Sequence, residues 1–264
     1  GVIVDAHGVG EVGTLHLNTR MPPLDDVRVR RAIAYALDRN GFLNTTSPRL
    51  SGPVFSPVPA QFLPGGLSEK DAGILKVDYP QDLARAKNLL TAAGYPNGFS
   101  LDITTSEKRV YKNYYFMMKE QLAKIGITCN VTIDTHVKMH KKIRTLPQPL
   151  VIYPAWRPNA DVYLTRFFHS DAIIVKGSRP DTNFSHYDKI DKLIEAARLT
   201  IDPAAQKNLW IQAQIRILDD MAAFPIMFTQ QCYARNIDVD YGHSLVSTMA
   251  LYPQFTENTC IKCQ

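Results

Sequence analysis

Residues 15–40 read LHLNTRMPPLDDVRVRRAIAYALDRN, and this stretch determines how the chain is organised. Leu15 and Leu17 alternate with His16 and Asn18, a period of two that predicts a half-buried strand. The two consecutive prolines that follow cannot donate to a strand ladder. The strand is therefore expected to end before them.

The second half of the stretch predicts an amphipathic helix. Asp25 and Asp26 supply an N-cap and an acidic first turn, so we expect the helix to start near Asp26. Gly41 is expected to end it. The apolar residues at helical spacing are Val29, Ile33, Ala36 and Leu37.

This stretch resembles the segment that marks family 5 extracellular solute-binding proteins, the dipeptide, oligopeptide and nickel-type receptors of ABC importers. The residues that carry the resemblance are LNT, followed by PPLDDVRVRRAIAYALDR. The resemblance implies an α/β fold: a periplasmic-binding-protein-like lobe (type II, cluster C) in three layers with a mixed β-sheet. It implies that residues 1–13 are the hinge or the remnant of a first lobe, that 14–240 form the second ligand-binding lobe, and that 241–264 are a C-terminal tail returning to the first lobe.

The composition is that of an ordinary globular protein, because 45% of the 264 residues are hydrophobic and 21% are charged. The formal net charge of +5 comes with no run of five like charges, so no nucleic-acid partner and only an indirect relation to the membrane are expected. The most basic segment, KMHKKIR at 138–144, is interpreted as a solvated helix face.

No stretch has the roughly 18 apolar residues of a membrane span, and the N-terminal residues lack the pattern of a signal peptide. The receptors that the chain resembles work in the periplasm or another extracytoplasmic compartment. We therefore expect that an N-terminal half, with the first lobe, is missing from this sequence.

The cysteines predict little chemistry. Cys260 and Cys263 form a CxxC motif without the second pair that a zinc site would need, and are interpreted as part of an exposed tail. Cys129 and Cys232 lie in apolar sequence and are expected to be buried thiols. A disulfide between them stays open as an alternative in an oxidising compartment.

Residues 44–66 predict a long irregular loop, because they contain Pro48, Pro53, Pro57, Pro59 and Pro64. Such a loop either covers a ligand cleft or wraps on the core as a connector. The quoted LSGPVFSPVPAQFLPGG is similar to the proline-rich segment over the cleft in the family, which favours the first alternative.

The middle of the chain predicts a parallel βαβ unit, after a helix over 81–93 in the family-like block DLARAKNLLTAAGYPNGF. A strand over 101–105, a helix over 111–125 and a strand from Ile127 follow one another. Arg109 stands just past the carboxyl end of the first strand, where α/β sheets bind ligands. With Tyr111 it is similar to the R-x-Y of dipeptide receptors, which implies that Arg109 takes a ligand carboxylate.

A third strand, LVIYPAW, ends at Trp156, whose ring offers a flat apolar wall for a ligand. The following WRPNADVYLTRFF resembles a family loop in which an aspartate three residues after the tryptophan pairs with the α-amine of a peptide. Asn159 stands at that place without a charge, so a free peptide N-terminus is not favoured. Asp161 would take the role of the family's aspartate only if the loop shifts by two residues.

The last blocks complete the predicted lobe. In SRPDTNFSHYDKIDKLIEAAR, which is similar to a family block, Asn183 is expected to face the cleft, and the residues from Asp191 are expected to form a helix. Asp202 caps a helix that begins at Pro203, and AAFPIMF is the final strand.

The sequence also bears on three other classes of function. His136 and His140 share a helix face, but the motif lacks the Glu of HExxH and lysines surround it, so neither a metal nor another cofactor is expected. Motifs for nucleophilic or nucleotide chemistry are lacking, so no enzyme is expected. An interaction domain that holds another protein at the hinge face predicts an exposed apolar patch.

The sequence thus predicts the C-terminal lobe of the substrate-binding component of an ABC importer. It would capture a peptide or peptide-like solute outside the cytoplasmic membrane and deliver it to the permease subunits. Alternative ligands are a non-peptide carboxylate, such as an opine or a glutathione-like solute, and a nickel chelate. The predicted ligand-binding residues are Arg109, Tyr111, Trp156, Asn159, Asp161 and Asn183.

Overall fold

The computed structural model describes residues 1–47, 49–246 and 253–262. Pro48, Cys263 and parts of the predicted tail lie outside these residues. The elements are β1 Val2–Leu17, α1 Val27–Ala36, α2 Arg39–Leu43, β2 Ser51–Pro53, α3 Glu69–Ile74, α4 Leu83–Ala92, β3 Phe99–Ser106, α5 Arg109–Ala123, β4 Ile127–Asp134, α6 His136–Thr145, β5 Leu150–Ala155, α7 Ala160–Phe168, the 3₁₀ turn η1 Ser170–Ala172, α8 Asp191–Leu199, α9 Pro203–Asp219, β6 Ala223–Asn236, β7 Val239–Asp240 and β8 Cys260–Ile261.

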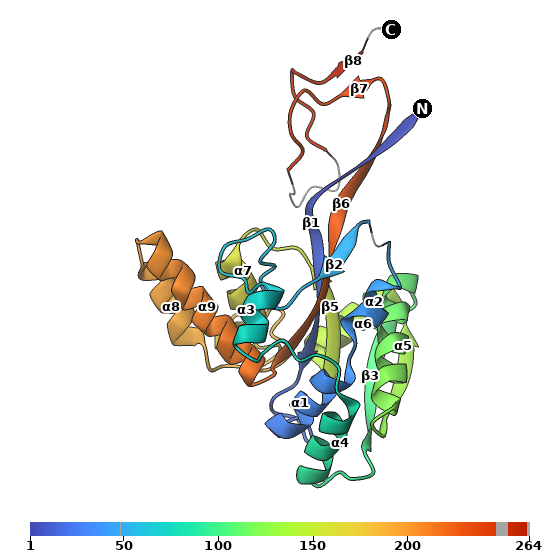
Figure 1. The fold of residues 1–264 in the computed structure, drawn as a ribbon, viewed down its shortest axis with the longest axis vertical. Coiled ribbons are helices and arrows are strands. Elements are labelled where there is room, and N and C mark those ends of the chain that lie inside the picture. The colour runs from blue at the N-terminus through green and yellow to red at the C-terminus, as the bar shows by residue number, and fades with distance from the viewer. Residues whose placement is uncertain (48, 247–252, 263–264) are drawn as a thin grey trace.

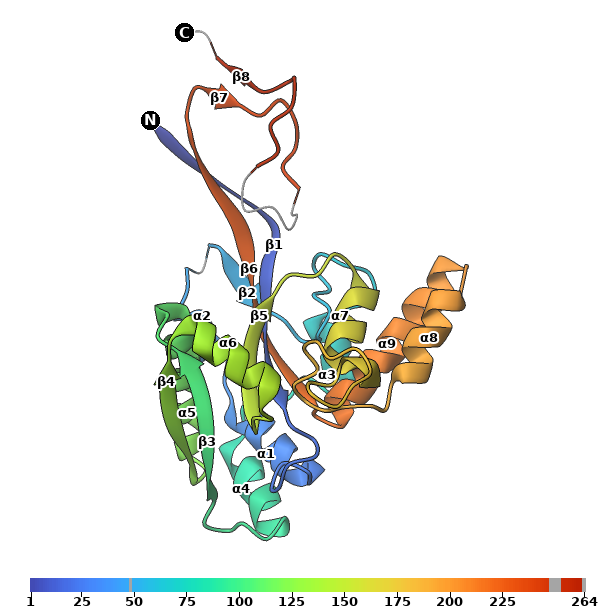
Figure 2. The ribbon, with the colours of Figure 1, turned by 180° about the vertical axis from the view of Figure 1, so that it is seen from behind.

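A four-stranded antiparallel sheet in the order β2-β6-β1-β5 forms the middle layer (Figure 1). Helices α1, α4 and α5 lie on one side of it, and α7, α8 and α9 lie on the other (Figures 1 and 2). A separate parallel pair, β3 and β4, is joined through α5, as the predicted βαβ unit requires. The α/β class is confirmed, with parallel pairing in β3–β4 and antiparallel pairing in the other two sheets of the described residues.

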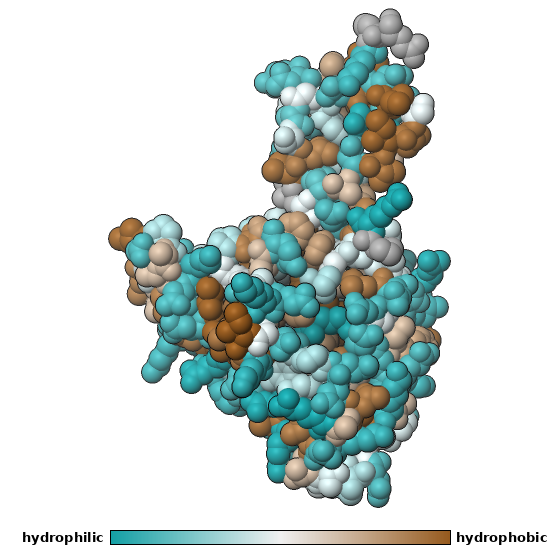
Figure 3. All heavy atoms as spheres, viewed as in Figure 1, coloured by the Kyte–Doolittle hydropathy of each residue, from teal (hydrophilic) through white to brown (hydrophobic). Residues whose placement is uncertain are grey.

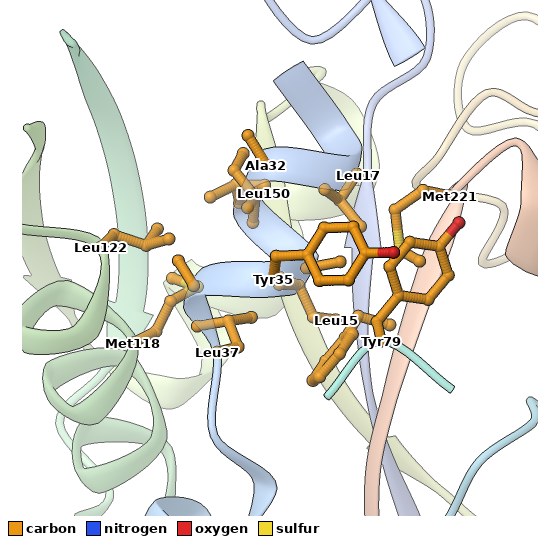
Figure 4. Packing of buried hydrophobic residues seen from close by; sticks show 14 of the residues in the cluster. Leu15, Leu17, Ala32, Tyr35, Leu37, Tyr79, Met118, Leu122, Leu150 and Met221 are labelled. Carbon is orange, nitrogen blue, oxygen red and sulfur yellow. The ribbon is translucent and has the colours of Figure 1, made fainter. Parts of the chain in front are cut away.

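Both faces of the sheet are covered, so the prediction of a half-buried strand at residues 15–18 was wrong. Leu15 and Leu17 are fully buried in the larger apolar cluster, on the side of α1 and α5 (Figure 4). His16 points to the opposite face, as neighbours on a strand must, and it is also buried, against Phe167 and Phe168. The polar residues of this strand therefore lie inside the protein.

The helix predicted from Asp26 begins as expected, because the Asp26 side chain accepts a hydrogen bond from the N–H of Arg28. The prediction that it ends at Gly41 was wrong. Leu37 is extended and ends α1, and Asp38 then caps a second helix, α2. Gly41 lies inside α2 where it packs on α5, since a Cβ there would stand 2.6 Å from Nε2 of Gln121.

The predicted loop at 44–66 lies largely on the core and contains one short strand, β2, which pairs with β6. Val54, Ser56 and Val58 are buried in it. Gln214 of α9 holds the segment, because its Oε1 accepts a hydrogen bond from the Val58 N–H over 2.9 Å. This packing agrees with the connector alternative, and a contact of the segment with ligand stays a prediction.

Strands β1 and β6 continue out of the body as a two-stranded ribbon (Figures 1 and 2). The ladder runs from His16↔Ala223 in the body to Val2↔Asn236 at the far end. Strands β7 and β8 pair beyond it. The predicted boundary between residues 13 and 14 therefore falls inside one continuous strand, and the division into lobes stays a prediction.

The cysteines were predicted correctly in part. Cys129 is buried, which raises the pKa of its thiol to about 11. Cys232 is exposed on the ribbon, so its predicted burial was wrong, because apolar neighbours in sequence do not bury a residue on a two-stranded ribbon. Cys129, Cys232 and Cys260 are free thiols, so the proposed bridge is not formed.

Candidate ligand-binding site

A pocket of about 460 Å³ lies where β5 ends, and residues of β1, of β5 and of β6 line it. Trp156 forms part of its wall and packs against the apolar cluster that contains Tyr163 and Phe167. Of the six predicted site residues, Trp156 alone is among its described lining residues. The lining comprises Gly10, Glu11, Tyr153, Pro154, Ala155, Trp156, Arg157, Thr229, Gln230, Gln231 and Cys232.

Arg109 is the first residue of α5 and follows β3 closely, as the sequence predicted. Its side chain is exposed, and among the described residues it has no acidic partner. A guanidinium in this state is available to an anionic ligand. Whether Arg109 binds one stays a prediction.

A row of rings joins the start of α5 to the wall of the pocket. The ring of Tyr111 lies 5.2 Å from that of His136, His136 lies 4.3 Å from His140, and His140 lies 5.8 Å from Tyr153, which lines the pocket. Burial raises the pKa of Tyr111, so its hydroxyl stays a proton donor. Tyr111, two residues after Arg109 in α5, is thus connected to the pocket through the two histidine rings.

Arg144 of α6 is a half-buried cation in this row that the sequence did not single out. It donates to the Tyr153 hydroxyl over 2.6 Å and to the carbonyl of His140 over 3.2 Å. Together with burial, it lowers the pKa of His140 to about 4, so this imidazole is neutral at pH 7. The helical spacing of His136 and His140 predicted a shared face, but their contacts with Tyr111 and Tyr153 depend on elements far away in sequence.

Two of the predicted polar residues make contacts within the protein. Asn159 caps α7, with its Oδ1 accepting the N–H of Val162 over 2.9 Å. Asp161 accepts a hydrogen bond from Nε of Arg198 over 2.8 Å, which joins α7 to α8. The shift by two residues that would bring Asp161 to the place of Asn159 is not seen, because Asp161 lies within the first turn of α7.

Asn183 does not face a cleft in this structure, contrary to the prediction. It is fully buried, and its amide nitrogen donates to the carbonyl oxygens of His169 and Tyr187. Its Oδ1 accepts from the Ser185 hydroxyl and from the Tyr187 N–H. Because the amide is fully bonded, Asn183 shapes the loop before α8 and reaches no solvent.

The described residues, 1–47, 49–246 and 253–262, contain no cluster of three or more histidine, cysteine or acidic side chains that could hold a metal ion. Within the same ranges, no helix is both long enough and apolar enough to cross a membrane.

Residues 4–173 match the family described as bacterial extracellular solute-binding proteins, family 5 Middle. The chain belongs to this family. Its members are transport receptors of ABC importers and not enzymes. The α/β structure, with its pocket beside a long two-stranded ribbon, is thereby assigned to a solute-binding protein family.

Similar proteins bind several kinds of solute. A solved structure of MoaA from A. tumefaciens R10, in complex with mannopinic acid, is 33% identical with a TM-score of 0.85, covering 99% of this chain and 52% of that one. The glutathione-binding protein GsiB of Pectobacterium atrosepticum is 24% identical over 84% of this chain and 43% of the relative. The dipeptide-binding protein of Escherichia coli K12 is 26% identical over 81% of this chain and 40% of the relative.

The chain spans about half the length of these relatives. Peptide, glutathione and opine receptors all lie within its range of similarity. The comparisons therefore identify the class of receptor but not its ligand. The ligand has to be inferred from the residues of the site.

Proposed function

We propose that this chain forms the ligand-contacting lobe of an ABC-importer receptor that captures a small solute with a carboxylate, of the peptide or opine type, in the periplasm or an equivalent extracytoplasmic space. The observation that carries the proposal is the pocket at the end of β5, with Trp156 in its wall. Delivery to the permease subunits is part of the proposal, and so is a second lobe that closes over the ligand.

The charges around the pocket support a carboxylate. Arg109 has no acidic partner among the described residues, and Arg144 is bound only to neutral groups in Tyr153 and His140. Arg157 lines the pocket itself. A cation without a counter-ion at a site that closes and loses water is stabilised by an anionic ligand.

Between the two ligand types, the place of Asn159 favours the opine type. Its side-chain oxygen caps α7, and an amide brings no charge to an α-ammonium. A peptide with a free N-terminus therefore lacks the ion pair that its receptors provide at this position. The 33% identity with the mannopinic acid receptor points in the same direction.

The test is a thermal-shift screen on the full product of the gene that encodes this chain. The panel contains dipeptides, N-blocked peptides, mannopinic acid and nickel chelates. Ligands that bind only the folded state raise the melting temperature. We expect a shift with a carboxylate ligand, which Arg109→Ala reduces to the level without ligand.

Lys119→Ala is the matched control, since Lys119 is an exposed cation further along α5 and outside the site. It should leave the ligand-induced shift unchanged. A carboxylate-induced shift of the same size in Arg109→Ala would contradict the role of Arg109. A panel in which no carboxylate shifts the wild-type protein would contradict the function itself.

A further inference from the structure

Glu11 and Trp156 line the same pocket, although no sequence pattern singled out Glu11. It follows an irregularity in the β1–β6 ladder, where the register shifts between His7 and Glu11. Gly8 supports this bulge with a φ of +52, and Gly10 lies so close to β6 that a Cβ would stand 3.1 Å from the carbonyl oxygen of Gln230. Bulges re-aim side chains, and this one presents Glu11 to the pocket.

Glu11 has no cationic partner among the described residues. Arg157 lines the same pocket, but its guanidinium lies 4.8 Å from the ring centroid of Phe167, and its Nη1 donates to the Trp156 carbonyl over 2.8 Å. The carboxylate is accessible to solvent at the mouth of the pocket, yet the surrounding protein raises its pKa by removing water. Burial is the main cause of the raised pKa of Tyr111 and Tyr114 on α5, and the charge of Glu11 is the second cause.

The other candidates for an acidic group near Trp156 are engaged. Asn159 is neutral and caps α7, and the carboxylate of Asp161 binds Arg198. Among the described residues that line this pocket, Glu11 is the one carboxylate. A ligand cation that enters the pocket therefore meets Glu11.

We propose that Glu11 binds a protonated amine of the solute against the face of Trp156, so that the ligand class is a zwitterion with its amine on the β1 side of the pocket. An ammonium between a carboxylate and an indole ring gains both an ion pair and a cation–π contact. The inference rests on the proposed function, because the carboxylate of the same solute is assigned to Arg109.

The experiment measures affinity by isothermal titration at pH 7.5 on the full product of the gene. The probes are mannopinic acid, which carries a secondary amine, L-alanyl-L-alanine, and the N-acetylated form of each. Glu11→Gln keeps the shape and removes the charge. We expect it to weaken the binding of the amine-bearing probes about 10- to 100-fold and to leave the acetylated probes unaffected.

Asp5→Asn is the matched control on the same strand, because Asp5 already pairs with Arg235 and lies outside this pocket. It should change no affinity. Equal affinities of wild type and Glu11→Gln for the amine-bearing probes, or an equal loss for both probe types, would overturn the role of Glu11. So would a wild-type protein that binds only acetylated probes. Failure of the wild type to bind any probe would overturn the proposed function as well.

Discussion

At the scale of one residue, His16 shows how packing on both faces of a strand determines the protonation state of a side chain. Its ring lies among Phe167, Phe168 and Phe184, and neither ring nitrogen has a hydrogen-bond partner among the described residues. Burial, followed by the nearby Arg157, lowers its pKa to about 3. The folded protein therefore keeps this imidazole neutral, whereas the unfolded chain takes up a proton near pH 6.5.

The first consequence is a loss of stability in acid. Because the unfolded state binds the extra proton, stability falls as the pH falls from about 6.5 towards 3, by about 2 kcal/mol at pH 5. Between pH 7.5 and 5, we expect the free energy of unfolding to fall less in His16→Leu than in the wild type, and the difference should equal this amount. Urea unfolding at both pH values measures it. His243→Gln, on the exposed tail, should not reduce the loss. Parallel curves for wild type and His16→Leu would contradict this assignment.

Single residues were predicted well where the chemistry is local. Asp26 and Asp202 cap helices as expected, because a cap depends only on the next few residues. The burial of Asn183 and the exposure of Glu11 in a pocket could not be predicted, since both depend on strands and loops far away in sequence. The resemblance supplied the family role of Arg109, and the structure leaves its side chain open for that role.

At the scale of elements, α9 anchors the proline-rich segment 44–66. Gln214 is fully buried, accepts the Val58 N–H and donates to the Gly65 and Trp210 carbonyls. Its amide replaces the regular partners that an irregular segment lacks. Periodicity predicted α9 and the loop separately, but it could not predict that one side chain joins them.

We expect Gln214→Ala to lower the free energy of unfolding by about 2–3 kcal/mol, because it leaves a buried N–H and carbonyl groups unpaired and opens a cavity. Gln212→Ala, an exposed neighbour on α9, should change it by less than about 0.5 kcal/mol. Urea unfolding of both variants provides the measurement. A loss in Gln214→Ala no larger than in the control would show that the segment is held by other contacts.

At the scale of the whole molecule, the ribbon differs from the body. Val2 and Val4 are 75% and 62% exposed on β1, and Figure 3 shows apolar side chains gathered on this extension. The residues of β1 from Val12 to Leu17 are buried. The interaction-domain alternative predicted an exposed apolar patch at the hinge face, and what covers this surface stays a prediction.

This contrast predicts the pattern of amide hydrogen exchange. A two-stranded ribbon in water is marginally stable, whereas strands inside a sheet open only with the core. We expect peptides covering residues 12–17 and 223–228 to be protected, and those covering 2–7 and 231–236 to exchange orders of magnitude faster. Mass spectrometry follows both sets in one experiment. Uniform protection along β1 would contradict the division between ribbon and body.

The bulge next to Glu11 also has a mechanical meaning. Two hydrogen-bonded strands resist bending within their own plane and bend easily across it, so a load at the outer end of the ribbon moves it along essentially one direction. The register shift between His7 and Glu11 interrupts the ladder outside the sheet, where no further strand of the described residues supports the ribbon. Bending at this interruption would take place beside the pocket, so a load on the paired residues Val2 and Asn236 at the far end would act on the strand segment that carries Glu11.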